Sequence, residues 1–121
     1  MTTKFMFLVL CVGMIAAGVF STHPVRAQDA PKRIQVTAKR FTYEPADITL
    51  KKGEPVVLVI NSADVAHGLR FRDLDLNAKI DKGASRELKF TPDKAGDFVG
   101  HCSVFCGSGH GGMTMTLHVV N

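Results

Sequence analysis

Residues 96–120 read GDFVGHCSVFCGSGHGGMTMTLHVV, in which a glycine-rich loop carries His, Cys and Met side chains between two strand-like segments. Phe98 and Val99 begin the first segment, and the second runs from Met113 to Val120 with alternating apolar and polar residues. Such alternation is typical of a strand with one buried face. The stretch therefore predicts a loop whose ends are held by strands, which can fix several side chains rigidly.

The rest of the chain also shows short strands separated by turns. Val56 to Ile60 is a continuous apolar run rich in β-branched residues, which favours a buried strand over a helix. Alternating or short apolar segments predict further strands at 33–38, 41–43, 47–50, 67–71 and 85–90. About eight short strands, with no sustained helical period, predict an all-β, antiparallel sandwich or barrel.

The N-terminal stretch differs from the rest and has the layout of a secretory signal peptide. Lys4 precedes an uncharged, apolar run from Phe5 to Phe20, and a polar segment then ends at Ala27. This run is short for a membrane span of about 20 residues, so we expect cleavage before Gln28 and no membrane span afterwards. The expected organisation is a signal peptide at 1–27, a lead-in at 28–32 and one domain at 33–121, exported to the periplasm or beyond.

Charge and cysteine content narrow the possible functions. The 15 Lys and Arg residues include Lys4 and Arg26 in the expected leader, so 13 remain against 11 Asp and Glu. The basic residues are scattered, so we expect no nucleic-acid partner. Cys11 would leave with the leader. Export would place the two remaining cysteines in an oxidising compartment, where they either form a disulfide or bind a metal.

The side chains of the loop are soft or borderline metal ligands. Cys102, Cys106, His110 and Met113 offer two thiols, an imidazole and a thioether. Together these groups favour copper over hard cations such as Mg²⁺ or Ca²⁺. His67 follows the buried strand and is the expected second imidazole, since in a sandwich that strand's end can lie beside the loop. The loop also contains four glycines, at positions 107, 109, 111 and 112. We expect them to remove side-chain bulk between the ligands and to let the backbone adopt unusual φ values.

The pattern resembles the CuA domain of cytochrome c oxidase subunit II, and less closely that of nitrous oxide reductase. The family's loop, Cys-x-x-x-Cys-x-x-x-His-x-x-Met, is matched at residues 102–113 without insertion. Its upstream Asp-Val-x-His is matched at residues 64–67, and its Gly-x-aromatic-x-Gly-x-Cys at residues 96–102. The resemblance implies a Greek-key cupredoxin β-sandwich that carries single electrons. Its partner would be a redox protein such as cytochrome c, or a terminal oxidase or reductase.

The same resemblance implies a binuclear copper centre with six ligands, namely His67, Cys102, Val104, Cys106, His110 and Met113. The two thiolates would each bridge two copper ions, and each imidazole would cap one of them. Met113 and the carbonyl oxygen of Val104 would be weak ligands, one to each ion. Two shared thiolates spread one electron over both metals, so each bond changes little and electron transfer is fast.

Alternatives remain open for the metal centre. Cys102 and Cys106 could form a disulfide, although so small a ring would stabilise little. A mononuclear blue-copper site would need only His67, Cys106, His110 and Met113, and zinc could fill the Cys₂His₂ set. The chain has no Trp and has Val104 where the family usually has Glu, which favours a stand-alone carrier or a periplasmic copper delivery or tolerance protein.

Other residues have lesser expected roles. Asp64 is expected to hold the loop of His67 through a turn-type hydrogen bond. His101 and His118 are expected at the surface. We find no paired carboxylates and no nucleophile–base arrangement, so we expect no catalysis by the chain alone. Any cytochrome c oxidase activity would belong to a complex that includes it.

Overall fold

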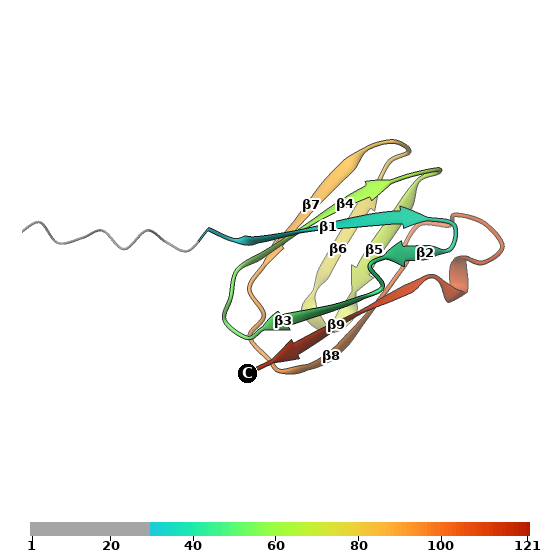
Figure 1. The fold of residues 1–121 in the computed structure, drawn as a ribbon. Coiled ribbons are helices and arrows are strands. Elements are labelled where there is room, and N and C mark those ends of the chain that lie inside the picture. Colours follow the sequence, from blue (N-terminus) through green and yellow to red (C-terminus); the bar gives the residue numbers. More distant parts are fainter. Residues whose placement is uncertain (1–29) are drawn as a thin grey trace, which may run out of the picture.

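The computed structural model describes residues 30–121 and shows two facing β-sheets (Figure 1). The expected signal peptide at 1–27 lies outside the described residues, as do the first two residues of the expected lead-in. Among residues 30–121, no helix is long and apolar enough to cross a membrane. The elements in chain order are β1 (Lys32–Lys39), β2 (Thr42–Glu44), β3 (Asp47–Lys51), β4 (Val56–Ser62), β5 (His67–Phe71), η1 (Arg72–Leu74), β6 (Leu76–Ile80), β7 (Ser85–Phe90), β8 (Gly96–His101), η2 (His110–Gly112) and β9 (Thr114–Val120).

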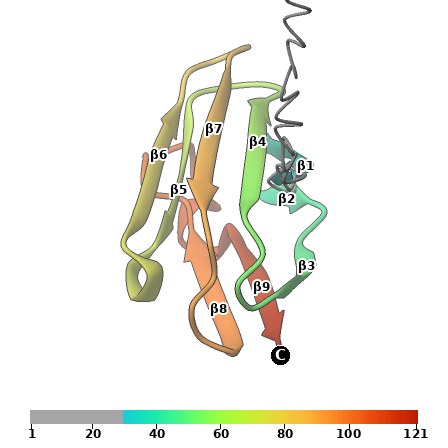
Figure 2. The same ribbon diagram turned by 90° about the vertical axis from the view of Figure 1, so that its left-hand side faces the viewer.

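The strands form one sheet in the order β2-β1-β4-β7 and a second in the order β3-β9-β8-β5-β6. Figure 2 shows the two sheets as separate layers. Most neighbours are antiparallel, but β1 pairs with β4 and β3 pairs with β9 in parallel. The predicted β-sandwich is therefore confirmed, whereas these two strand pairs are parallel and not antiparallel as expected. Between β1 and β4 the chain crosses to the other sheet as β3 and returns, and a crossover of this kind is what joins parallel neighbours.

The core lies between the sheets and follows the alternation seen in the sequence. On β9, Met115, Leu117 and Val119 are buried, whereas the intervening residues are partly exposed. On β4, the apolar run from Val56 to Ile60 is buried throughout, which confirms the predicted buried strand. Burying one Leu, Ile or Val side chain contributes roughly 1.5–3 kcal/mol. These contacts hold the two layers together.

One strand, β6, is missing from the sequence-based prediction. Leu76, Ala78 and Ile80 alternate with polar residues and pair along the whole of β5. The period of two was present in the sequence, but three apolar residues among many charged ones make a weak pattern. β6 matters for the site because Ile80 pairs with His67, at the start of β5.

Three adjacent strands, β5, β8 and β9, place the loop that carries the predicted ligands. The loop joins β8 to β9, which are antiparallel neighbours. At its base the amide of Cys102 donates a hydrogen bond to the carbonyl of Met113, with 3.1 Å between nitrogen and oxygen. Because β5 runs antiparallel to β8, the start of β5 lies beside the end of β8. The start of β5, which is His67, and the loop therefore meet, and Figure 1 shows this end of β5 and the loop at the end of the sandwich opposite the C-terminus.

On the outer face of β9, His118 links that strand to both of its neighbours. Its Nδ1 lies 2.7 Å from Oδ1 of Asp97 on β8, and its Nε2 lies 2.9 Å from Oδ1 of Asp47 on β3. The side chain is 37% exposed, as expected of a surface residue. The hydrogen bonds to Asp47 and Asp97 raise the pKa of His118, and burial opposes them only weakly. The protonated imidazole therefore stabilises this part of the sheet.

We expect His118→Gln to lower the free energy of unfolding at acidic pH and to have little effect at alkaline pH. The folded pKa of His118 lies above the unfolded value of about 6.5. Its stabilisation is thus fully present below about pH 6.5 and is lost as the pH rises through the folded pKa. Urea unfolding of metal-free protein at about pH 5.5 and about pH 9 would measure this.

His101→Gln is the matched control, because His101 is an exposed histidine at the end of the neighbouring strand β8. An equal loss of stability at both pH values in the His118 variant would contradict the charge-based explanation.

Candidate metal centre

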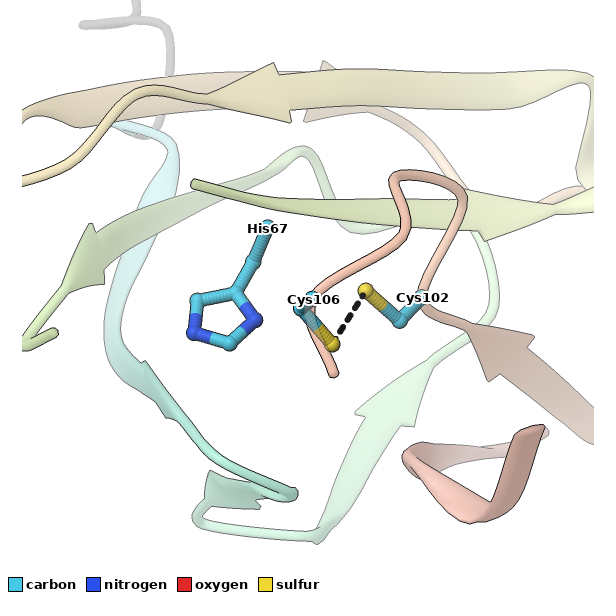
Figure 3. Close-up of side chains that lie close together, drawn as sticks. All are labelled: His67, Cys102 and Cys106. Atoms are coloured by element: carbon cyan, nitrogen blue, oxygen red, sulfur yellow. Dashed lines mark hydrogen bonds between the residues drawn. The ribbon is translucent and has the colours of Figure 1, made fainter. Parts of the chain in front are cut away.

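Side chains from β5 and from the loop meet inside one end of the sandwich. His67, Cys102, Cys106 and Met113 are at most 5% exposed, and His110 is partly buried. The ligand atoms of His67, Cys102 and Cys106 all lie within 4.8 Å of one another. Figure 3 shows the ring of His67 beside the sulfur atoms of the two cysteines.

The sulfur of Cys106 is the centre of the cluster. It lies 3.6 Å from Sγ of Cys102, 3.7 Å from Nδ1 of His110 and 3.8 Å from Sδ of Met113. Sγ of Cys102 lies 3.1 Å from the carbonyl oxygen of Val104. The structure thus brings together all six residues that the sequence singled out, although they come from two separate segments of the chain.

The two cysteines are held as thiols. Both are free, and their sulfur atoms are 3.6 Å apart, against about 2.05 Å in a disulfide. Burial raises the pKa of Cys106 to about 11, the contact with Cys102 adds to this, and the positive charge of Arg40 opposes it. Since metals bind the thiolate, a metal that binds here must displace the proton of Cys106.

The imidazole of His67 offers the clearest sign that the cluster fits a metal. The side chain is fully buried, and its Nδ1 has no hydrogen-bond partner among residues 30–121. Leaving a buried polar atom unpaired costs about 1–3 kcal/mol. The other ring nitrogen, Nε2, is hydrogen-bonded to Asp64 at 2.6 Å, which places the proton on Nε2 and leaves the lone pair on Nδ1. A lone pair beside two thiols fits a soft or borderline metal ion.

Asp64 orients this imidazole and also shapes the turn, as predicted from the sequence. Its Oδ1 accepts hydrogen bonds from His67 and from the amide of Val65, and its Oδ2 accepts one from the amide of Arg40 at 2.8 Å. Burial alone would raise the pKa of Asp64, but the bonds from Arg40, His67 and Val65 lower it to about 2. Asp64 is therefore an anion at neutral pH, and its hydrogen bond to His67 is charge-assisted.

Arg40, just after β1, is a positioning residue that sequence reasoning missed. Its Nε donates to the carbonyl of Cys106 at 2.9 Å, and its backbone amide donates to Asp64. One residue thus ties the loop of the cysteines to the turn that orients His67. Nothing in the sequence distinguishes Arg40 from the other basic residues, because its role depends on segments that are distant along the chain.

The loop glycines have different roles from those expected. Gly107 has a φ of +141°, a conformation that favours glycine. At Gly109 an added Cβ would lie 2.4 Å from the ring of Phe41, so this glycine permits the ring to pack on the loop. At Gly111 and Gly112 an added Cβ would meet nothing within 4 Å. The unusual φ expected of all four is found at Gly107 alone.

Gly68 on β5 is a second residue that the sequence reasoning missed. A Cβ at this position would lie 2.1 Å from Oγ of Ser103 and 2.9 Å from the backbone nitrogen of Val104. The amide of Gly68 points at Sγ of Cys102, 3.5 Å away, and its carbonyl accepts a hydrogen bond from the hydroxyl of Tyr43. The absence of a side chain lets the ligand loop rest directly on β5.

Comparison with known proteins agrees with this geometry. A family model described as a cupredoxin-like domain matches residues 8–115. The chain belongs to this family. Cytochrome c oxidase subunit 2 of Thermus thermophilus is 30% identical to this cupredoxin over 86 residues, which are 71% of this chain and 64% of that protein. The chain thus spans just under two thirds of the length of this relative.

Solved structures share the fold. The periplasmic domain of subunit II of cytochrome oxidase from Bradyrhizobium japonicum superposes with a TM-score of 0.69 at 19% identity, over 76% of this chain and 86% of that one. The metal-binding domain of a Cu(I)-exporting P-type ATPase from Streptococcus pneumoniae, determined with Cu(I), superposes at 0.60 with 22% identity, over 74% and 85%. The predicted resemblance to subunit II and the cupredoxin β-sandwich are both confirmed.

We expect Gly68→Ala to expose the two thiols while the sandwich stays folded. The added methyl group would collide with Ser103 and with the backbone of Val104 and would push the loop away from β5. Such overpacking costs about 1–3 kcal/mol. In metal-free protein, iodoacetamide should therefore alkylate Cys102 and Cys106 several-fold faster than in the parent protein.

Gly111→Ala is the matched control, because a Cβ there meets nothing within 4 Å. Equal alkylation rates in the two variants would show that the close approach at Gly68 does not hold the loop in place.

Proposed function

We propose that this cupredoxin binds copper through His67, Cys102, Val104, Cys106, His110 and Met113, and carries single electrons. The observation that supports this most strongly is the buried cluster of two free thiols and an unpaired imidazole nitrogen. Thiolates, a thioether and imidazoles are a donor set that favours copper. The relationship to cytochrome c oxidase subunit 2 supports the same assignment.

The chain itself would hold the ligands in fixed positions and shield them from water. Copper bound by these residues supplies a one-electron couple. The hydrogen bond between Cys102 and Met113 closes the base of the loop, and Asp64 sets the ring of His67. Ligands held in this way move little when the charge at the site changes, which suits rapid electron transfer. Six donor groups leave no place for a substrate, so we propose no catalysis by the chain alone.

We further propose that two copper ions bind rather than one. The thiols of Cys102 and Cys106 are both buried and 3.6 Å apart, so both can be shared between two ions. Further donors lie beside each sulfur, namely Val104 near Cys102, and His110 and Met113 near Cys106. A mononuclear site would leave the buried thiol of Cys102 without a role.

Copper content and the EPR spectrum of the copper-loaded protein test this proposal. Two copper ions per chain with a seven-line hyperfine pattern are expected, because one electron is then shared by two nuclei. We expect Cys102→Ser to abolish that pattern. A parent protein with one copper and a four-line pattern would be a mononuclear cupredoxin instead. Failure of the reduced protein to bind copper tightly would overturn the function as a whole.

Asp64 supplies a second test, because it orients His67 without being a proposed ligand. We expect Asp64→Asn to weaken copper binding by about 10–100-fold, as is typical when the partner of a metal-binding histidine is lost. Competition with a Cu(I) chelator at about pH 7, where the carboxyl of the parent protein is ionised, would measure the affinity.

Asp97→Asn is the matched control, since Asp97 makes an equivalent hydrogen bond to His118 on the outer face of the sheet. Equal losses of affinity in both variants would contradict a specific role for Asp64.

The cellular setting is proposed from the sequence. We propose that residues 1–27 direct export to the periplasm or beyond, and that the redox partner is cytochrome c or a terminal oxidase or reductase. Rapid electron exchange with cytochrome c in stopped-flow mixing would support the carrier role. Slow exchange, combined with transfer of Cu(I) to an apo-acceptor, would instead support copper delivery.

A further inference from the structure

A groove of about 450 Å³ lies beside the metal centre and is lined mainly by basic residues. Arg70 lies on β5 directly opposite His101 at the end of β8, and Arg72 is the first residue of η1. All three are exposed. Cys102 and Ser103, at the start of the ligand loop, complete the lining.

The two arginines have no neutralising partner within the described part of the chain. The ion pairs among residues 30–121 involve other basic residues, namely Arg33, Lys39, Lys79, Lys89, His67 and His118. Asp73 and Asp75, the acidic residues nearest in sequence, line a different hollow. Cations gathered in a concave surface without counter-charges produce a positive potential that attracts anions.

The groove also reaches the candidate metal centre. Cys102, a proposed ligand, contributes to its lining, and His101 precedes it in the chain. Ser103 Oγ donates to Oδ1 of Asn77 on β6 at 3.0 Å, which holds the start of the loop against the sheet. A protein seated here would therefore lie next to the metal centre, and proximity of this kind favours transfer between two sites.

We propose that this groove docks an acidic surface of the protein that exchanges electrons with the metal centre. The proposal rests on the electron-transfer function proposed above. Guanidinium groups bind carboxylates in a planar, two-point arrangement. Exposed and hydrated cations steer and orient a charged protein. A site built to retain a small anion would need buried donors, whereas Arg70, Arg72 and His101 are all exposed.

Hexacyanochromate(III), a redox-inert paramagnetic anion, can map the groove by NMR. Reduced protein is diamagnetic both without metal and with Cu(I), so the anion should selectively broaden the amide signals of Arg70, Arg72, His101 and Ser103. The double variant Arg70→Gln/Arg72→Gln should lose this broadening. Lys51→Gln/Lys52→Gln removes the same charge at the end of β3 and should retain the broadening.

A peptide of glutamate residues with blocked ends tests whether the groove accepts protein carboxylates. It should shift the same signals, and added salt should reverse the shifts. With reduced, copper-loaded protein, the rate constant for oxidation by hexacyanoferrate(III) at low ionic strength should fall about tenfold in the arginine variant and stay unchanged in the lysine variant.

Three results would overturn the proposal. Equal broadening of the signals of all basic residues would show that the anion does not bind selectively in this groove. Binding of the chromium anion without any response to the peptide would indicate a small-anion site instead of a protein partner. Equal electron-transfer rates in both double variants would show that the groove has no role in electron transfer. The metal-free NMR experiment is independent of copper binding, so failure of the proposed function would be recognised separately.

Discussion

The close packing of the ligand loop on β5 at Gly68 is the constraint on which the rest of the metal centre depends. A Cβ at Gly68 would lie 2.1 Å from Ser103 Oγ, so the loop reaches its position only because no side chain intervenes. That approach brings the thiol of Cys102 under the amide of Gly68 and within 4.8 Å of the imidazole of His67. The contact thus brings together the two segments that carry the proposed ligands.

Hydrogen bonds made by Arg40 and Asp64 also hold the ligand loop and the turn before β5 in place. The guanidinium group of Arg40 donates to the loop carbonyl of Cys106, and its backbone amide donates to the carboxylate of Asp64. That carboxylate also accepts a hydrogen bond from His67. The carboxylate of Asp64 thus links the imidazole of His67 to the backbone of Arg40, and hydrogen bonds to an ionised group are stronger than those between neutral groups. The positive charge of Arg40 acts on the ligand loop instead, where it lowers the pKa of the Cys106 thiol against the effect of burial.

The local features of the molecule could be predicted from the sequence, whereas its long-range contacts could not. The alternation along β9 correctly indicated which of its residues enter the core, and the spacing of Cys102, Cys106, His110 and Met113 indicated a shared site. Both patterns are local, since they record which face of a strand or loop is buried. The parallel pairing of β3 with β9 and the role of Arg40 depend on contacts between distant segments. Such contacts produce no periodic pattern in the sequence.

The position of β9 inside its sheet has a consequence for the order of assembly. This strand lies between β3 and β8. The last strand in sequence order is therefore flanked by neighbours on both sides. Its pairing with β3 joins residues far apart in the chain, and such pairing is slow to form. The loop acquires its second anchor only when β9 inserts, and until then Met113 is not held near the thiols. Binding of a metal ion through Met113 would therefore depend on the pairing of β9 with β8, and a bound ion would in turn stabilise that pairing.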